Sequence, residues 1–302
     1  MADVTFPLAP ASVQNGAITL DLFVKEPTRI SNYVSQLVQA NLVSQFVYSS
    51  ASATGGAIMF DRVVDNVATA DRDPGVIAPG GEFPVLGTAQ GEPVVEAVVK
   101  TGGKFAITRE AMKRNDPTIA QRNAQRVANT MVKDIDQRAF SAITEDLAKV
   151  DGALTFDSPG WQAALDVAGG TKTAKTGDGQ IVSDLLDAKL LVEETGLGYS
   201  PDTLVLSPQA RTAMQKLLGL ENWQGVLQSL GLTAYTTTAL TDPGEALLLQ
   251  RGAVGVMGVE DPISTDNEYV KSNQTTWFYT WASMAFGLTD PFAVVKITGL
   301  EK

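Results

Sequence analysis

The feature that most constrains the fold is an uninterrupted helical pattern from Pro117 to Leu147. Asp116-Pro117 is a strong start signal, because Asp accepts from the first-turn N–H groups and Pro fits the first helical position. At 1.5 Å per residue, such a helix would be about 45 Å long, well beyond the usual length in globular proteins. The pattern therefore predicts a structural beam. Its apolar residues recur at intervals of three and four: Ala120, Ala124, Val127, Met131, Ile135, Ala139, Ile143 and Leu147.

A ribbon of two strands is predicted before this helix. Residues 57–67 and 93–100 are rich in β-branched residues, and the segment between them contains repeated Gly and Pro. An isolated two-stranded ribbon is marginal in water, and long ordered loops are usually functional. We therefore expect the ribbon to pack against something else, and a neighbouring subunit is the natural candidate.

The remaining segments predict an arm and a second, compact domain. Residues 1–25 carry short apolar pieces without a stable period, and Glu26-Pro27 then opens an amphipathic helix. Whether that helix packs on its own domain or elsewhere is open from the pattern alone. Short helices and strands alternate after residue 175, which indicates an α/β or α+β domain. Two strands follow at 277–286 and 292–298, and the first has apolar residues on both faces, which predicts burial on both sides.

Composition excludes several classes of function. The chain has no Cys and no His, so thiolate metal sites, cysteine nucleophiles and Ser-His arrangements are absent. Carboxylate pairs, Mg²⁺ or Ca²⁺ sites and Ser-Lys chemistry remain open. A net charge of −11 argues against a nucleic-acid reader, which needs clustered Lys and Arg. Neither a signal peptide nor an apolar run of about 18 residues is visible, so a cytoplasmic protein without a membrane span is expected.

No motif in the sequence predicts a catalytic site, a cofactor or a metal. The stretch 169–179 has glycines and lysines but lacks the Gly-Lys-Ser/Thr ending of a phosphate-binding loop, so a flexible interdomain loop is favoured. Asp71, Asp73 and Glu82 could hold Ca²⁺, but their spacing is not that of an EF-hand, so a solvated acidic tip is favoured.

The order of these parts resembles the Hong Kong 97-type major capsid proteins of tailed bacteriophages. The best local matches are the elbow at 104–110, the strand-cap-helix LVLSPQA at 204–210 and the Asp-Pro-Phe-Ala turn at 290–293. The resemblance implies an α+β fold with an extended loop and a long spine helix. The parts it implies are an N-terminal arm at 1–56, the extended loop at 57–107, a peripheral domain at 108–174 and 270–302, and an axial domain at 175–269.

The resemblance also implies a function. It predicts a structural protein that assembles into hexamers and pentamers of an icosahedral phage head enclosing double-stranded DNA. The partners implied are other copies of the chain, a separate scaffolding protein, a portal, a decoration protein in some heads, and DNA contacted non-specifically. Its place would be the virion, after assembly in the cytoplasm of a host bacterium. An encapsulin-type nanocompartment is the alternative within this fold, and an enzyme with carboxylate or metal chemistry in 175–269 is the alternative of another class.

Two departures from the family pattern limit what carries over. Some members join subunits by an isopeptide bond from a lysine in the extended loop to a neighbour's asparagine, but residues 68–99 contain no lysine. Lys100 and Lys104 lie at the base of the predicted ribbon, so that chemistry is not expected. The chain also starts almost at the arm, which makes a separate scaffolding protein the simpler expectation.

Charge suggests where subunits meet. The predicted ribbon is acidic against the single Arg72, while the long helix is locally basic. Ion pairs between subunits would explain this distribution, and an ordinary charged solvent face explains it nearly as well. The predicted contact residues are Asp71, Asp73, Glu82 and Glu92 on the ribbon and Arg122 and Arg126 on the helix.

Overall fold

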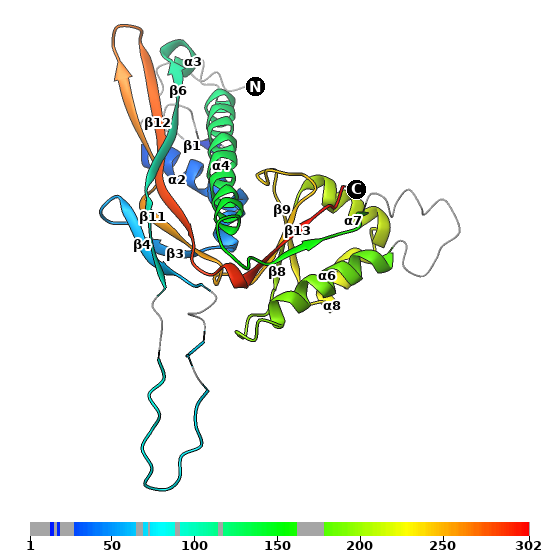
Figure 1. Ribbon diagram of the computed structural model, residues 1–302. Helices are drawn as coiled ribbons and strands as arrows, with labels where there is room; N and C mark the ends of the chain where they lie inside the picture. Colours follow the sequence, from blue (N-terminus) through cyan, green and yellow to red (C-terminus); the bar gives the residue numbers. More distant parts are fainter. Residues whose placement is uncertain are drawn as a thin grey trace.

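The computed structural model describes residues 13–14, 17–18, 27–64, 69–71, 73–87, 91–113, 117–161 and 178–301. It has two lobes, one around a long helix and one around a second sheet, and a ribbon projects from the lobe with the long helix (Figure 1). The long helix, α4, spans Pro117–Leu147, as the apolar pattern predicts. Its side chains at Ala124, Met131 and Ile135 are buried along one stripe. The Asp116 start signal lies outside the described residues.

A four-stranded sheet packs on α4 in the order β3-β11-β12-β6. Its strands are Ser49–Ser52 (β3), Gly255–Val270 (β11), Thr275–Leu288 (β12) and Val99–Thr108 (β6), and helix α3 (Arg109–Lys113) follows β6. The Phe105 and Phe278 rings stack at 5.0 Å between sheet and helix. Strand β12 pairs without interruption with β6, and it pairs along its length with β11 apart from irregularities between Val259 and Ser264, so the sheet forms a long support beside α4.

The helix predicted after Glu26 packs on its own lobe. This helix, α2 (Pro27–Asn41), buries Val34 and Val38 completely and contacts α4 and β11. The Asp136 carboxylate of α4 then accepts from the Val43 and Ser44 N–H groups at 3.1 and 2.9 Å, where the short 3₁₀ helix η1 (Ser44–Phe46) begins. Burial raises the pKa of Asp136, and these hydrogen bonds oppose that shift. A two-residue pair, β1 (Val13–Gln14) and β2 (Ala17–Ile18), lies ahead of α2.

The prediction that residues 277–286 are buried on both faces is wrong for one face. Phe278 is fully buried, but Trp277, Tyr279 and Trp281 on the opposite face are only half-buried. Helices α2 and α4 cover only one face of this sheet. On the other face, lysine side chains partly cover the aromatic rings. The Lys104 ammonium lies 4.6 Å from the Trp277 ring centroid, and Lys100 lies 5.1 Å from that of Trp281.

The second lobe is a five-stranded sheet with helices on one face. The strand order is β7-β13-β10-β8-β9, with β10 antiparallel to its neighbours. Ser207 accepts from the Ala210 N–H at 3.1 Å and so caps α7, as the sequence predicts. The strands are Thr155–Asp157 (β7), Val294–Thr298 (β13), Ala246–Leu249 (β10), Thr203–Leu206 (β8) and Thr233–Thr236 (β9); the helices are Asp178–Glu193 (α6), Pro208–Leu218 (α7) and Trp223–Ser229 (α8).

The sequence-based domain bounds place residues 255–269 in the axial domain and residues 294–298 in the peripheral domain, but the sheets divide these two segments differently. Residues 255–270 form β11 beside the spine helix, whereas β13 lies within the second sheet. The cause is where the chain crosses: a turn at Gly252 separates β10 from β11, and the 3₁₀ helix η2 (Pro291–Ala293) separates β12 from β13. The Tyr199 hydroxyl donates a hydrogen bond to Asp290 at the second crossing, and the ring centroids of Phe46 and Tyr235 lie 4.9 Å apart in a stacked pair. These contacts join the two lobes.

Candidate assembly surfaces

Alternate residues of one strand pack the base of the ribbon against the lobe that contains α4. Strand β4 (Ala57–Arg62) pairs antiparallel with β5 (Glu92–Ala97), and Ile58, Phe60 and Arg62 share one face. Ile58 fills a notch at Gly258, and Phe60 fills a notch at Gly287, because a Cβ at either glycine would overlap these side chains. The glycines therefore fix where the ribbon leaves the body.

A buried ion pair completes this anchor. The Arg62 guanidinium lies 2.8 Å from the Asp146 carboxylate in the last turn of α4 and also donates to the Leu288 carbonyl at 3.3 Å. Both charged side chains are only 7% exposed. Lys149 adds a second cation at 3.0 Å from Asp146, while burial, and then the nearby Asp146, raises the pKa of Glu96. The beam and the ribbon are thus joined by charge as well as by packing.

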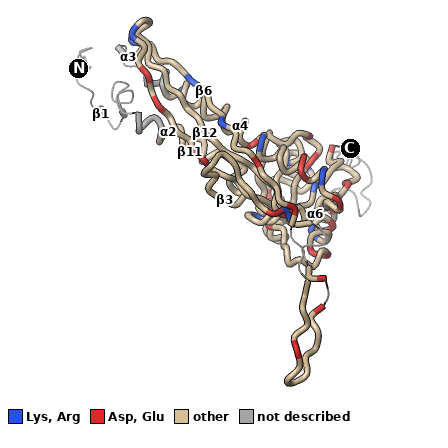
Figure 2. Tube along the Cα trace, turned by 60° about the vertical axis from the view of Figure 1, so that its left-hand side comes forward, with Lys and Arg blue, Asp and Glu red and all other residues tan. Residues whose placement is uncertain are grey.

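Beyond its base the ribbon stands away from both lobes (Figures 1 and 2). The Asp71 N–H donates to the Gly87 carbonyl at 3.1 Å, and the Gly87 N–H donates to the Asp71 carboxylate at 2.7 Å. These bonds join the two sides of the ribbon above its tip. The tip itself, residues 73–86, has no helix or strand.

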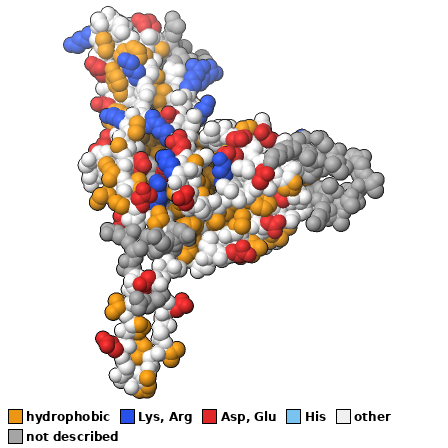
Figure 3. All heavy atoms as spheres, viewed as in Figure 1, with side chains coloured by type: hydrophobic (Ala, Val, Ile, Leu, Met, Phe, Trp, Pro, Cys, Tyr) orange, Lys and Arg blue, Asp and Glu red, His pale blue; other side chains and the backbone are white. Residues whose placement is uncertain are grey.

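The tip carries large apolar side chains that the sequence analysis did not single out. Phe83 is 79% exposed and Val85 is 82% exposed, and Val76 is fully exposed. Hydrophobic spheres line the projecting ribbon in Figure 3. Several such residues on one projecting segment mark an interaction surface. The available signal was the apolar run at 83–86 inside a segment otherwise rich in Gly and Pro.

The predicted acidic residues lie at different heights on the ribbon. Asp73 and Glu82 are exposed on the tip, Asp71 closes the ribbon above the tip, and Glu92 pairs in register with Arg62 at the base. Arg72 lies outside the described residues. The four carboxylates therefore share the ribbon but form no cluster.

The predicted basic residues lie on the spine helix, away from the ribbon of the same chain. Arg122 and Arg126 are both exposed and sit one helical turn apart. The described part of one chain brings neither arginine to an acidic residue of the ribbon, because the ribbon points away from α4 (Figure 1). Contact between the two sets would need a second copy.

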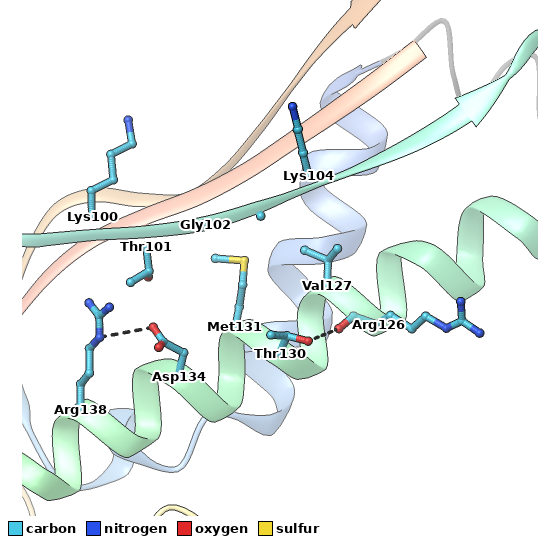
Figure 4. Close-up of a pocket in the computed structure, with 11 residues that line it drawn as sticks. Lys100, Thr101, Gly102, Lys104, Arg126, Val127, Thr130, Met131, Asp134 and Arg138 are labelled. Carbon is cyan, nitrogen blue, oxygen red and sulfur yellow. Dashed lines mark hydrogen bonds and ion pairs between the residues drawn. The ribbon is translucent and has the colours of Figure 1, made fainter. Parts of the chain in front are cut away.

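A hollow of about 490 Å³ lies between β6 and α4 (Figure 4). On the side of β6 that faces α4, the buried pair Ile107 and Phe105 is followed by Gly103 and Thr101, which are too small to continue the core. Lys100 and Lys104 point to the other face. From α4, the lining residues are Arg126, Val127, Thr130, Met131, Asp134 and Arg138, and Arg138 pairs with Asp134 at 3.3 Å.

Comparison with known proteins settles the family. A family model described as phage capsid protein matches residues 91–297, which include the spine helix, the strands β6, β11 and β12 of the first sheet and nearly all of the second sheet. The chain belongs to the family of phage capsid proteins. No curated protein sequence matches the chain.

Solved structures confirm the fold of this capsid protein. One is a virus-like particle from Pyrococcus furiosus, with a TM-score of 0.60 and 12% identity, covering 89% of this chain and 98% of that one. Another is the capsid of cyanophage P-SCSP1u, also with a TM-score of 0.60 and 12% identity, covering 86% and 89%. The mature capsid of bacteriophage PhiM1 matches with a TM-score of 0.53 and 12% identity, covering 85% and 86%. The Hong Kong 97-type α+β fold expected from the sequence is confirmed.

The family match establishes the coarse function. The protein is a phage major capsid protein, a structural component of the virion that assembles with its own copies into a shell, and the encapsulin alternative is not favoured. No helix among the described residues is long and apolar enough to cross a membrane. Over the same residues, no group of three acidic side chains is placed to hold a metal ion.

Capsid subunits of this chain are expected to lack covalent links through the ribbon. Residues 68–99 contain no lysine, and both lysines at the ribbon base lie over tryptophan rings on β12. Mature particles boiled in denaturant should therefore run at the monomer mass of 32.0 kDa on a gel. A ladder of multimers that survives boiling would contradict this expectation.

Proposed function

We propose that this capsid protein assembles as hexamers and pentamers into a closed icosahedral head around double-stranded DNA. The single observation that carries the proposal is the ribbon: a projecting segment with exposed Phe83 and Val85 and no core of its own. A ribbon of this kind gains its stability only by packing on another copy. Closed rings and shells supply such a neighbour to every subunit.

The two lobes would divide the work of assembly. The lobe with the spine helix is assigned the peripheral role predicted for 108–174 and 270–302, and the five-stranded lobe the axial role predicted for 175–269. On the strand pairing described above, we place β11 with the peripheral lobe and β13 with the axial lobe. The axial lobe would surround the axes of the hexamers and pentamers.

The remaining expectations from the family resemblance complete the proposal. A separate scaffolding protein and a portal would guide assembly in the cytoplasm of the host bacterium, and a decoration protein is a further candidate partner. The net charge of −11 suits a wall that lies near packaged DNA and contacts it non-specifically at most. No catalytic role is proposed for the chain.

Electron microscopy of the purified protein tests this proposal most directly. Expression with the scaffolding protein should yield closed shells that sediment as particles, and particles from infected cells should contain DNA. A stable monomer that forms no particles at high concentration, even beside the scaffolding protein, would overturn it. A packaged enzyme in place of DNA would indicate a nanocompartment.

The ribbon is proposed to dock on the spine helix of a neighbour, with the acidic side chains facing Arg122 and Arg126. Exposed ion pairs contribute about 0.2–1 kcal/mol each and are screened by salt. Burying the phenyl ring of Phe83 would contribute roughly 1.5–3 kcal/mol. The apolar side chains should therefore supply most of the affinity, and the charges should set position and salt dependence.

The double substitution Arg122→Glu and Arg126→Glu should impair shell formation and lower the salt tolerance of shells, with little effect on subunit folding. Reversed charge would repel Asp73 and Glu82 of the neighbouring ribbon. Sedimentation of shells across a salt series measures the effect, and thermal unfolding of the subunit provides the reference. The double substitution Arg122→Gln with Arg126→Gln is the matched control, and the salt tolerance of its shells should lie between those of the wild type and the Glu variant. Unchanged salt and heat tolerance in the Glu pair would mean that the arginines are only solvated surface.

A further inference from the structure

Among the described residues, strand β6 is the edge strand of the four-stranded sheet and has no strand on its outer side. In the described residues, the four-stranded sheet ends at β6, which pairs only with β12, from Met284 and Val99 to Thr275 and Thr108. Every second backbone N–H and C=O of an edge strand points outward and is free to accept another strand. The hollow above α4 runs beside this edge along residues 100–104.

The ribbon tip is the complementary element. Between residues 73 and 86, the described chain has one backbone hydrogen bond within the protein, from the Gly81 N–H to the Ala78 carbonyl at 2.8 Å. The two sides of the tip run alongside each other without forming a ladder (Figure 1). The tip thus combines free backbone groups with exposed apolar side chains.

We propose that residues 82–86 of a second copy add to β6 as a fifth strand and place Phe83 and Val85 in the hollow. This inference rests on the proposed docking of the ribbon and specifies how the ribbon binds. Residues two apart on a strand share a face, so Phe83 and Val85 can enter together against Val127 and Met131.

The position of Pro84 fits this arrangement. If residues 83 and 85 direct their backbone groups toward β6, the intervening residue 84 directs its own outward. Proline has no N–H to donate, and it is tolerated at such an outer position of an edge strand. It would also keep a further strand from adding outside the ribbon.

Charge also favours binding of the ribbon tip at the hollow between β6 and α4. Glu82 and Asp73 are exposed on the tip, and Arg126 and Arg138 line the hollow. Asp134 pairs with Arg138, whereas Arg126 forms no ion pair among the described residues. The hollow therefore offers an apolar floor, a free strand edge and positive charge to a tip that is apolar, extended and acidic.

Hydrogen exchange in shells and in isolated subunits tests the strand addition. Outward-facing amides of residues 99–104 should exchange about five- to tenfold more slowly in shells, as expected for one added hydrogen bond each. Wild-type shells whose β6 amides exchange as in the subunit would overturn the strand addition but leave the shell function standing. Failure of the wild type to form shells would instead count against the proposed function.

A steric variant provides the second test. A Cβ at Gly103 would meet nothing within 4 Å, so Gly103→Leu should fill the hollow and leave the subunit folded. We expect this variant to lose shells, with its thermal unfolding unchanged. Lys104→Gln, on the opposite face of the same strand, is the matched control and should still form shells. Normal shells from Gly103→Leu would overturn the proposed binding in the hollow, and an unfolded variant would return the decision to the exchange measurement.

Discussion

Replacing Arg62 by Ala is expected to destabilise the folded subunit by about 3–5 kcal/mol, because it leaves a buried carboxylate without its partner. Arg62 and Asp146 are 2.8 Å apart and both 7% exposed. Lys149 cannot compensate fully, since its side chain is 65% exposed and its pair with Asp146 is largely solvated. Chemical denaturation of the isolated subunit measures the loss.

The double substitution Arg62→Met with Asp146→Leu separates the charge effect from the packing effect. Well-packed apolar replacements of a buried ion pair are often neutral in stability. The double variant should therefore recover most of what Arg62→Ala loses. If Arg62→Ala itself costs less than about 1 kcal/mol, the pair behaves as a surface ion pair and does not anchor the ribbon.

Substituting Val for Gly287 is expected to destabilise the subunit by about 1–3 kcal/mol, the usual cost of overfilling a packed site. A Cβ at residue 287 would overlap the Phe60 ring, so either the ring or the ribbon base must move. Thermal unfolding gives the loss. Since Gly287 does not have a positive φ, the cost would come from this overlap and not from backbone strain.

Phe60→Ala supplies the matched test, because it removes the ring that the new side chain meets. Combined with Gly287→Val, it should cost less than the sum of the two single changes, by roughly 0.5–3 kcal/mol for residues in contact. Strict additivity would show that Phe60 does not fill the notch. At Gly252, which has a φ of 73° and open space around it, no such rescue is expected from any neighbour.

The elements that the sequence predicts well are those with local causes. The spine helix begins and ends at Pro117 and Leu147 as predicted, because one apolar period governs its whole length. The strand at 203–206 and the Ser207 cap are likewise encoded within a few residues. The placement of β11 and β13 was not predictable in this way, since it depends on which distant strand each one meets.

The assembly surfaces follow the same division. Charge on the ribbon and the helix is visible in the composition of each segment, so Asp73, Glu82 and Arg126 could be proposed as contacts from the sequence. The ribbon anchor could not, because Arg62 and Asp146 are separated by 84 positions and meet only after folding. The hollow depends on small residues at 101 and 103 facing α4, which a strand pattern alone does not reveal.

Strands β12 and β13, from the last part of the chain, occupy inner positions in the two sheets. Each pairs with a strand on both sides, so neither sheet can close before residues 275–298 have left the ribosome. Until then the apolar stripe of the spine helix and the inner edge of β6 lack their covering. A chain whose synthesis stops before residue 275 lacks an inner strand of each sheet, so we expect truncated products to be excluded from the shell.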